Sequence, residues 1–159
     1  GLEYFSLKGH FFDMIGIKTA DDVYFLADSL VSEETIKKYH IFFLYDVKEY
    51  LNTLDYLAAL NGKLYIASHC EATDNIIPII NANRDKVKEI CNTIISLCEE
   101  EIIFEDLLKK VFDAYNLSMN ANQYVLIGST IKSYLSYLYE EGKIGFEFKD
   151  NRMVWKQKQ

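Results

Sequence analysis

Short apolar segments that alternate with helical patterns constrain the fold of this chain more than any other feature. Four segments rich in β-branched and aromatic residues are bounded by polar turns, as strands usually are, and cover residues 2–7, 14–18, 23–27 and 63–67. Apolar residues recur at helical spacing in residues 47–60 and 74–98, and Ser32 followed by Glu33 and Glu34 indicates a further helix over residues 33–39. Strands that alternate with helices predict an α/β domain, which we place at residues 1–100.

Residues that favour helix ends and strand burial refine this prediction. Asp46 and Asp74 precede helical segments, and their carboxylates can accept hydrogen bonds from the free amides of a first turn. Asn61–Gly62 is typical of a helix end, and His40 stands where it can cap the end of the first helix. Segment 2–7 carries apolar residues in both alternating registers, which predicts a strand covered on both faces.

The composition changes after residue 100. Residues 1–100 contain 9 Lys/Arg and 16 Asp/Glu, a net charge of −7, whereas residues 101–159 contain 8 of each. The second segment has three helical patterns followed by a two-stranded ribbon, at residues 104–115, 122–128, 130–141, 144–148 and 153–156. Three helices followed by a ribbon form the layout of a winged helix. We therefore predict a small winged-helix-like α+β domain at residues 101–159.

Composition also argues against several partners and locations. A net charge of −7 disfavours a general polyanion binder, and the predicted helix 130–141 has one basic residue, Lys132, so nucleic acid is not an expected partner. No apolar run approaches the roughly 20 residues of a membrane helix, so no membrane is expected. The three cysteines are odd in number and form no CxxC pair, which favours a reducing cytoplasm.

Three potential metal ligands stand where predicted strands end. His10 follows the first strand, Asp28 the third and His69 the fourth. Two imidazoles and a carboxylate suit zinc, iron or manganese, and a carboxylate can bridge two ions. Taken one at a time, each residue has an ordinary structural explanation in a turn or a cap. The hypothesis of a metal site therefore depends on the three residues together.

The cysteines have simpler interpretations. Cys70, beside His69, could be a thiol nucleophile, but no separate base accompanies it, and a small packed residue explains it more simply. Cys91 and Cys98 lie on the apolar stripe of the segment 74–98, so we expect both in the core.

The candidate ligands and their neighbours resemble a known family. Gly9-His10, Ile15-Gly16-Ile17, Val23-Tyr24-Phe25-Leu26-Ala27-Asp28-Ser29-Leu30 and Ser68-His69 are similar, in order and spacing, to the second half of a metallo-β-lactamase-fold hydrolase. The resemblance covers about residues 1–100 and assigns His10 and His69 as metal ligands and Asp28 as the bridging carboxylate. It implies half of an αββα sandwich with one or two divalent ions, zinc first and iron or manganese as alternatives. Metal-bound hydroxide would attack an ester, thioester or related bond of a small-molecule substrate. Some members similar to this chain carry a C-terminal winged-helix-like domain.

Departures from the family pattern shape the functional prediction. The leading signature His-x-His-x-Asp-His is absent, and the chain contains only three histidines. Ala27 and Cys70 stand where the family usually has glycine. The chain also begins without Met, so we expect it to be the C-terminal portion of a hydrolase, inactive alone and lacking the N-terminal half of its domain.

Two further expectations follow from this interpretation. Half of a sandwich exposes an apolar sheet face, so we expect the chain to self-associate. The alternative function, from a different class, is a non-catalytic interaction or regulatory module whose metal site is vestigial.

Overall fold

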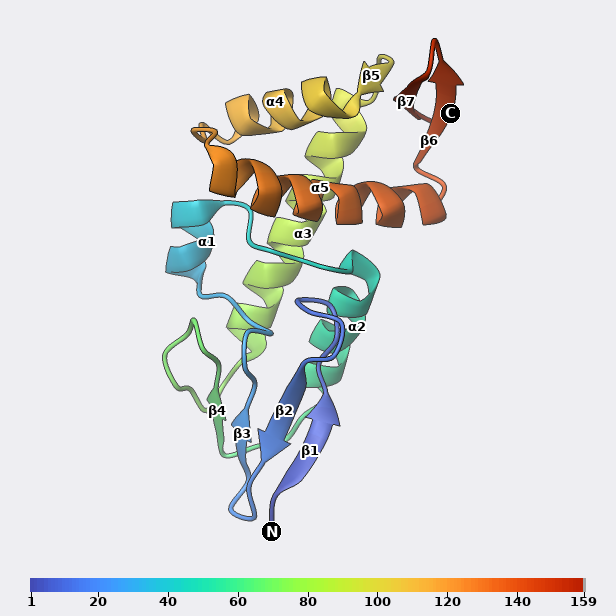
Figure 1. The fold of residues 1–159 in the computed structure, drawn as a ribbon. Helices are drawn as coiled ribbons and strands as arrows, with labels where there is room; N and C mark the ends of the chain where they lie inside the picture. The colour runs from blue at the N-terminus through green and yellow to red at the C-terminus, as the bar shows by residue number, and fades with distance from the viewer. Residues whose placement is uncertain (159) are drawn as a thin grey trace. The chain divides into compact units, whose positions relative to one another are not determined.

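The computed structural model describes residues 1–158, and Figure 1 shows the order of its helices and strands. The elements are β1 (Glu3–Ser6), β2 (Ile15–Lys18), β3 (Val23–Phe25), α1 (Glu33–Tyr39), α2 (Val47–Ala58), β4 (Leu64–Ile66), α3 (Ile77–Leu97), β5 (Ile102–Ile103), α4 (Phe104–Ala114), α5 (Ala121–Glu140), β6 (Ile144–Lys149) and β7 (Arg152–Gln157). They divide into two compact units, Gly1–Val87 and Lys88 onward. None of the described helices is long and apolar enough to cross a membrane.

The first unit is built on a four-stranded sheet in the order β1-β2-β3-β4. The first three strands are joined by antiparallel pairing, and β4 is parallel to β3 after a crossover that contains α1 and α2. The four predicted strands are therefore present, each shorter than its predicted segment. This mixed α/β arrangement brings the ends of β3 and β4 to the same edge of the sheet, because parallel strands end on the same side.

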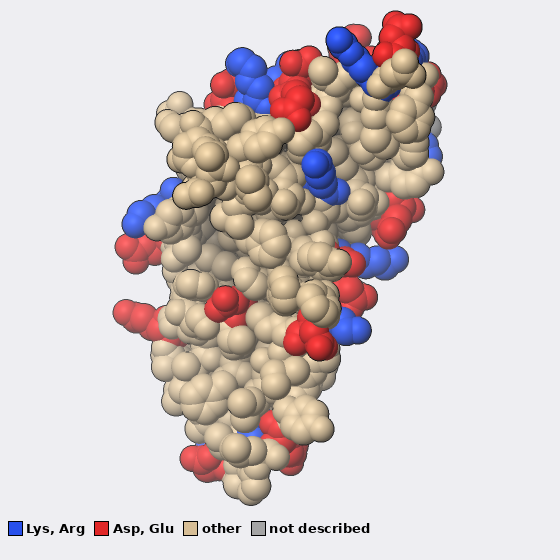
Figure 2. All heavy atoms as spheres, viewed as in Figure 1, with Lys and Arg blue, Asp and Glu red and all other residues tan. Residues whose placement is uncertain are grey.

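Helices cover one face of this sheet. Phe5 and Tyr24 lie on the covered face, where the Phe5 ring is 5.6 Å from the ring of Tyr56 on α2. One register row across the opposite face consists of Tyr4, Ile17, Phe25 and Ile66. Tyr4 is 81% exposed and Phe25 is 43% exposed, so apolar side chains of this row face solvent. Figure 2 shows few charged side chains over these strands.

The prediction that residues 2–7 are covered on both faces is wrong. Both registers of this segment are apolar, as predicted, but only the register of Phe5 and Leu7 packs inward. Leu2 and Tyr4, in the other register, are exposed because no second layer packs on that face within residues 1–158.

The helix caps follow local chemistry in some places and tertiary contacts in others. The Asp46 carboxylate accepts a hydrogen bond from the amide of Glu49 at 2.9 Å, which confirms the predicted start of α2. His40 is the C-cap of α1, also as predicted. α3 begins at Ile77, and the side-chain oxygen of Asn75 accepts from the amide of Ile77 at 3.2 Å, so the predicted helix start at Asp74 is too early.

The predicted end of α2 at Asn61–Gly62 is also wrong, because α2 ends at Ala58. Gly62 instead belongs to the turn into β4, where its amide donates to the hydroxyl of Tyr65 at 2.6 Å. A β-carbon at Gly62 would lie 2.5 Å from the ring of Tyr24, so this turn needs a residue without a side chain.

The second unit contains two complete helices where the sequence predicted three. The expected helices at 122–128 and 130–141 form one continuous helix, α5. Gly128 does not interrupt it, and a β-carbon there would make an ordinary contact with Leu108 of α4 at 3.6 Å. The hydroxyl of Ser129 donates to the carbonyl of Val125 at 2.7 Å, which is compatible with a continuing helix.

Strand β5, which the sequence did not predict, completes a three-stranded antiparallel sheet in the order β5-β7-β6. The predicted ribbon is confirmed as β6 and β7, and its turn residues Asp150 and Asn151 both have positive φ, as tight hairpins require.

The division between the two units lies inside α3, whereas charge and composition placed it at residue 100. The last turns of α3 contact the later elements, which explains the difference. Thr93 shares a 3.3 Å hydrogen bond with the hydroxyl of Tyr115, and the carbonyl of Cys98 accepts from the amide of Gln157 at 2.6 Å. Cys91 and Cys98 are buried, as predicted.

Candidate functional site

The three predicted ligands lie together, in turns that follow β1, β3 and β4. His10 Nε2 is 3.6 Å from Asp28 Oδ2, and His69 Nε2 is 3.7 Å from Asp28 Oδ1. The side chain of His10 is 24% exposed, that of Asp28 39% and that of His69 55%. Each imidazole therefore faces a different oxygen of one carboxylate, in a position that solvent can reach.

The surroundings of the His10 ring favour its neutral form and a defined orientation. Burial lowers the pKa of His10, while the negative charge of Asp28 opposes that change. The ring also makes a hydrogen bond to the backbone carbonyl of Phe43, and the Phe43 ring packs edge-on at 5.6 Å. A neutral imidazole oriented by a carbonyl is the form in which histidine binds a metal.

The backbone beside His10 approaches α2 closely. Gly9 has φ +117°, and a β-carbon there would lie 2.3 Å from the backbone of Tyr50. Its carbonyl accepts hydrogen bonds from the amides of Tyr45 and Asp46, at 2.9 and 3.0 Å. Glycine is therefore required here both by conformation and by space.

Backbone pairing continues past the ends of β3 and β4 and brings Asp28 to His69. The amide of Ser68 donates to the carbonyl of Ala27 at 2.8 Å, and the amide of Ser32 donates to the carbonyl of His69 at 3.2 Å. Ala27 has φ +47°, a conformation that favours glycine. The turn between these contacts carries Asp28.

Cys70 is not arranged as a nucleophile. Burial raises the pKa of its thiol to about 11, so the thiolate is scarce near neutral pH. The Sγ atom donates a weak hydrogen bond to the carbonyl of Leu30 at 3.6 Å. The packing interpretation of Cys70 agrees with this environment.

The donor atoms suit a divalent ion in type, but they do not form a complete site. Two ligands of one tetrahedral zinc ion are separated by about 3.4 Å, so each His–Asp28 pair has a separation close to that of neighbouring ligands. No group of three or more His, Cys, Asp or Glu residues among residues 1–158 is arranged to hold a metal ion. His10 and His69 thus form two pairs that share Asp28, and each pair supplies only two donors.

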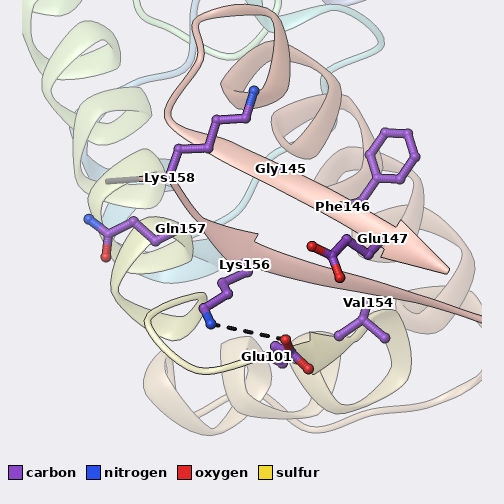
Figure 3. A pocket seen from close by; sticks show the side chains of 8 residues that line it. All are labelled: Glu101, Gly145, Phe146, Glu147, Val154, Lys156, Gln157 and Lys158. Atoms are coloured by element: carbon purple, nitrogen blue, oxygen red, sulfur yellow. Dashed lines mark ion pairs between the residues drawn. The ribbon is translucent and has the colours of Figure 1, made fainter. Parts of the chain in front are cut away.

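Two pockets on the described surface are lined by residues from different segments of the chain. One of about 720 Å³ adjoins His69 and is lined by polar groups that include Ser68, Thr73 and Glu71. The other, of about 220 Å³, lies on the β6–β7 ribbon; Figure 3 shows Lys156 and Glu101, which form an ion pair at 4.0 Å beside it. Of these two, the first includes a candidate ligand and the second does not, so the first is the one relevant to this site.

Comparisons with known proteins support the fold. No protein-family model and no curated protein sequence matches this chain. Two solved structures match 99% of it: a metallo-β-lactamase family protein from Thermus thermophilus, with 15% identity and a TM-score of 0.73, and a β-lactamase domain protein from Burkholderia ambifaria, with 14% identity and a TM-score of 0.77. The match covers 49% and 48% of those chains. The chain therefore adopts part of the metallo-β-lactamase fold and spans about half the length of the structures that it matches.

Sequence reasoning missed the residues that support the candidate ligands, namely Phe43, Tyr50 and Asn83. Nothing in the sequence indicates that the Phe43 carbonyl contacts His10. Asn83, however, lies between Ile80 and Val87 on the apolar stripe of α3 and is completely buried. An amide on an apolar stripe is a recognisable signal, because a buried polar group needs hydrogen-bond partners.

Proposed function

We propose that this chain is the C-terminal portion of a metal-dependent hydrolase in which Asp28 bridges two metal positions. One observation carries the proposal. The imidazoles of His10 and His69 face different oxygens of the Asp28 carboxylate, at 3.6 and 3.7 Å. A carboxylate that bridges two ions presents its oxygens in this way, one to each ion.

The residues of this chain would hold and orient the ions. Asp28 would bridge them, while His10 and His69 would each bind one, with the His10 ring oriented by the Phe43 carbonyl. A bound divalent ion lowers the pKa of water to near neutrality and polarises carbonyl oxygens. Zinc is our first choice, with iron or manganese as alternatives, and the substrate would be a small molecule with an ester, thioester or related bond.

The remaining metal ligands would come from the other half of the domain. The two matched structures extend over about twice the length of this chain, which agrees with a second half packed on the exposed sheet face. We propose that the N-terminal half of the domain covers the row of Tyr4, Ile17 and Phe25 in the complete protein, and that a second copy covers it when this chain is alone. The isolated chain would then be inactive as a hydrolase.

The segment from Lys88 onward would form a winged-helix-type module. Supporting this are the order helix, strand, helix, helix and ribbon, and the sheet order β5-β7-β6. Residues 88–159 contain 9 Lys/Arg and 11 Asp/Glu, and α5 contains a single basic residue, Lys132. We infer a role in packing on the hydrolase domain or shaping its substrate entrance, and not in nucleic-acid binding.

A non-catalytic interaction or regulatory module is the second candidate. The observation that favours it is the absence of a three-residue metal group among residues 1–158. In that case the candidate ligands would be vestigial and would serve only as a group of paired side chains between turns.

Substitution of the bridging carboxylate tests these two functions. In the full-length protein that contains this chain, Asp28→Ala should lower both bound zinc, measured by elemental analysis after dialysis, and hydrolysis of a panel of chromogenic esters and thioesters. We expect a loss of at least about 100-fold in activity, since changes to groups that only orient the ligands already cost about 10- to 100-fold.

The matched control is His40→Asn, which changes the remaining histidine. His40 is the C-cap of α1 and is not one of the three candidate ligands, and asparagine keeps a polar side chain at this position, so this variant should keep its zinc and activity. Unchanged zinc content and activity in Asp28→Ala would refute the hydrolase site and favour the non-catalytic module.

A further inference from the structure

A completely buried amide on α3 holds the turn that carries Asp28. Asn83 Oδ1 accepts a hydrogen bond from the amide of Val31 at 3.1 Å, and Asn83 Nδ2 donates to the carbonyl of Val31 at 2.7 Å. Asn83 Nδ2 also donates to the carbonyl of Ile79 at 2.8 Å. The side chain thus bonds both polar groups of Val31, as a neighbouring β-strand would.

The other side of Val31 meets the turn that carries His69. Val31 and His69 form an isolated parallel β-bridge, and the amide of Ser32 donates to the carbonyl of His69 at 3.2 Å. Val31 therefore lies between Asn83 and the His69 backbone. Because Asp28 is three residues before Val31 in the same turn, a shift of Val31 would move Asp28 relative to His69.

The same network reaches the turn that carries His10. The hydroxyl of Tyr50, on α2, donates to Asn83 Oδ1 at 2.8 Å. Burial raises the pKa of Tyr50, so its hydroxyl remains a donor at all moderate pH values. The backbone of Tyr50 is the surface against which Gly9 packs, and Thr53, one turn later, donates to the carbonyl of Lys8 at 2.7 Å.

We propose that Asn83 and Tyr50 are positioning residues that fix the separation of Asp28 from His10 and His69. The role of this positioning in metal binding rests on the proposed metal site, but the positioning itself involves residues of this chain alone. The side chains of Asn83 and Tyr50 are buried. Loss of Asn83 removes the side-chain partner of both polar groups of Val31, whereas loss of the Tyr50 hydroxyl removes one of the two hydrogen bonds that Asn83 Oδ1 accepts. The network therefore specifies one arrangement of three turns that have little regular structure of their own.

Tyr50→Phe is the most conservative test, since it removes one hydroxyl and keeps the ring. The matched control is Tyr65→Phe, in the same unit, which removes a hydroxyl that contacts Leu60 and Gly62 at the other end of β4. Amide hydrogen exchange, followed by NMR, would compare Ser32, which donates to His69, with Leu26, which donates to Ile66 between β3 and β4.

We expect Tyr50→Phe to raise the exchange rate of Ser32 by about tenfold more than that of Leu26, and to shift the imidazole signals of His10 and His69. Tyr65→Phe should change both rates by the same factor and leave the imidazole signals in place. Asn83→Leu should exceed Tyr50→Phe in both effects; if that variant does not fold, Tyr50→Phe decides the question.

Equal acceleration of Ser32 and Leu26 in Tyr50→Phe, with unchanged imidazole signals, would overturn the proposal, because the network would then support only global stability. The exchange measurement needs no metal, so it can succeed even if the proposed hydrolase function fails. A second readout is zinc affinity in the full-length protein, where Tyr50→Phe should weaken binding about tenfold and Tyr65→Phe should not.

Discussion

The apolar row on the open sheet face should govern association of this chain. Phe25 lies in the middle of that row, between Ile17 of β2 and Ile66 of β4, and is 43% exposed. A phenylalanine side chain presents about 200 Å² in all, so roughly 85 Å² of Phe25 is available for burial, worth about 2 kcal/mol per chain at about 25 cal/mol/Å². Phe25→Lys removes that contribution and adds a charge that an apolar interface would have to desolvate.

Both copies in a dimer lose this contribution, and a total loss of about 4 kcal/mol corresponds to roughly a 1,000-fold larger dissociation constant. Sedimentation equilibrium of this chain, over about 1 to 100 μM, measures that constant directly. The matched control is Phe148→Lys, because Phe148 is 72% exposed on the β6–β7 ribbon and lies outside the sheet face. That variant has the same change in charge and hydropathy, and it should associate like the parent chain.

Two results would refute this reasoning. A parent chain that is monomeric over the whole concentration range would show that the row is not covered by a second copy. Equal weakening by Phe25→Lys and Phe148→Lys would show that association depends on general charge or hydropathy, and not on this face. Circular dichroism should be the same for all three proteins, since both phenylalanines are already partly or largely solvent-exposed.

Two further substitutions have defined outcomes. Gly9→Ala should lower the free energy of unfolding, measured with urea, by at least about 2 kcal/mol, because its β-carbon would overlap the backbone of Tyr50. Gly142→Ala, with φ +69° and open space around it, should lower that free energy by only about 1 kcal/mol. Equal losses in the two variants would contradict the close approach of Gly9 to Tyr50. The Lys149 ammonium lowers the pKa of Glu101, so their ion pair adds stability above pH 4.5 that is lost as the pH falls through the lowered pKa. Calorimetry between about pH 5.5 and about pH 3 should therefore show a smaller fall in Tm for Glu101→Gln than for the parent, and identical falls would exclude the pair as a contributor.

Elements set by neighbouring residues were predictable from the sequence. Asp46 caps α2 through a bond to an amide three residues away, and Asp150–Asn151 turns the ribbon with two residues that tolerate positive φ. The same holds for the strands of the first unit, whose apolar composition placed them to within a few residues. For the cap and the turn, the controlling interaction lies within a few positions along the chain.

Elements set by distant contacts were not predictable in this way. The sequence predicted separate helices at residues 122–128 and 130–141, yet α5 runs without a break from Ala121 to Glu140. Strand β5 contains two residues and depends on pairing with Val154 and Trp155, about 50 positions later. Local propensity is a weak preference that packing overrides in such places.

The sequence by itself determined the chemistry available to this protein: two histidines and an aspartate, each placed just after a strand. Tertiary structure alone decided that His10 and His69 meet opposite oxygens of Asp28, and that Asn83, 52 positions from Val31, holds the turn between them. The physical reason is that ligand type is a property of single residues. The distance between ligands, in contrast, depends on strand pairing and on buried hydrogen bonds between segments far apart in the chain.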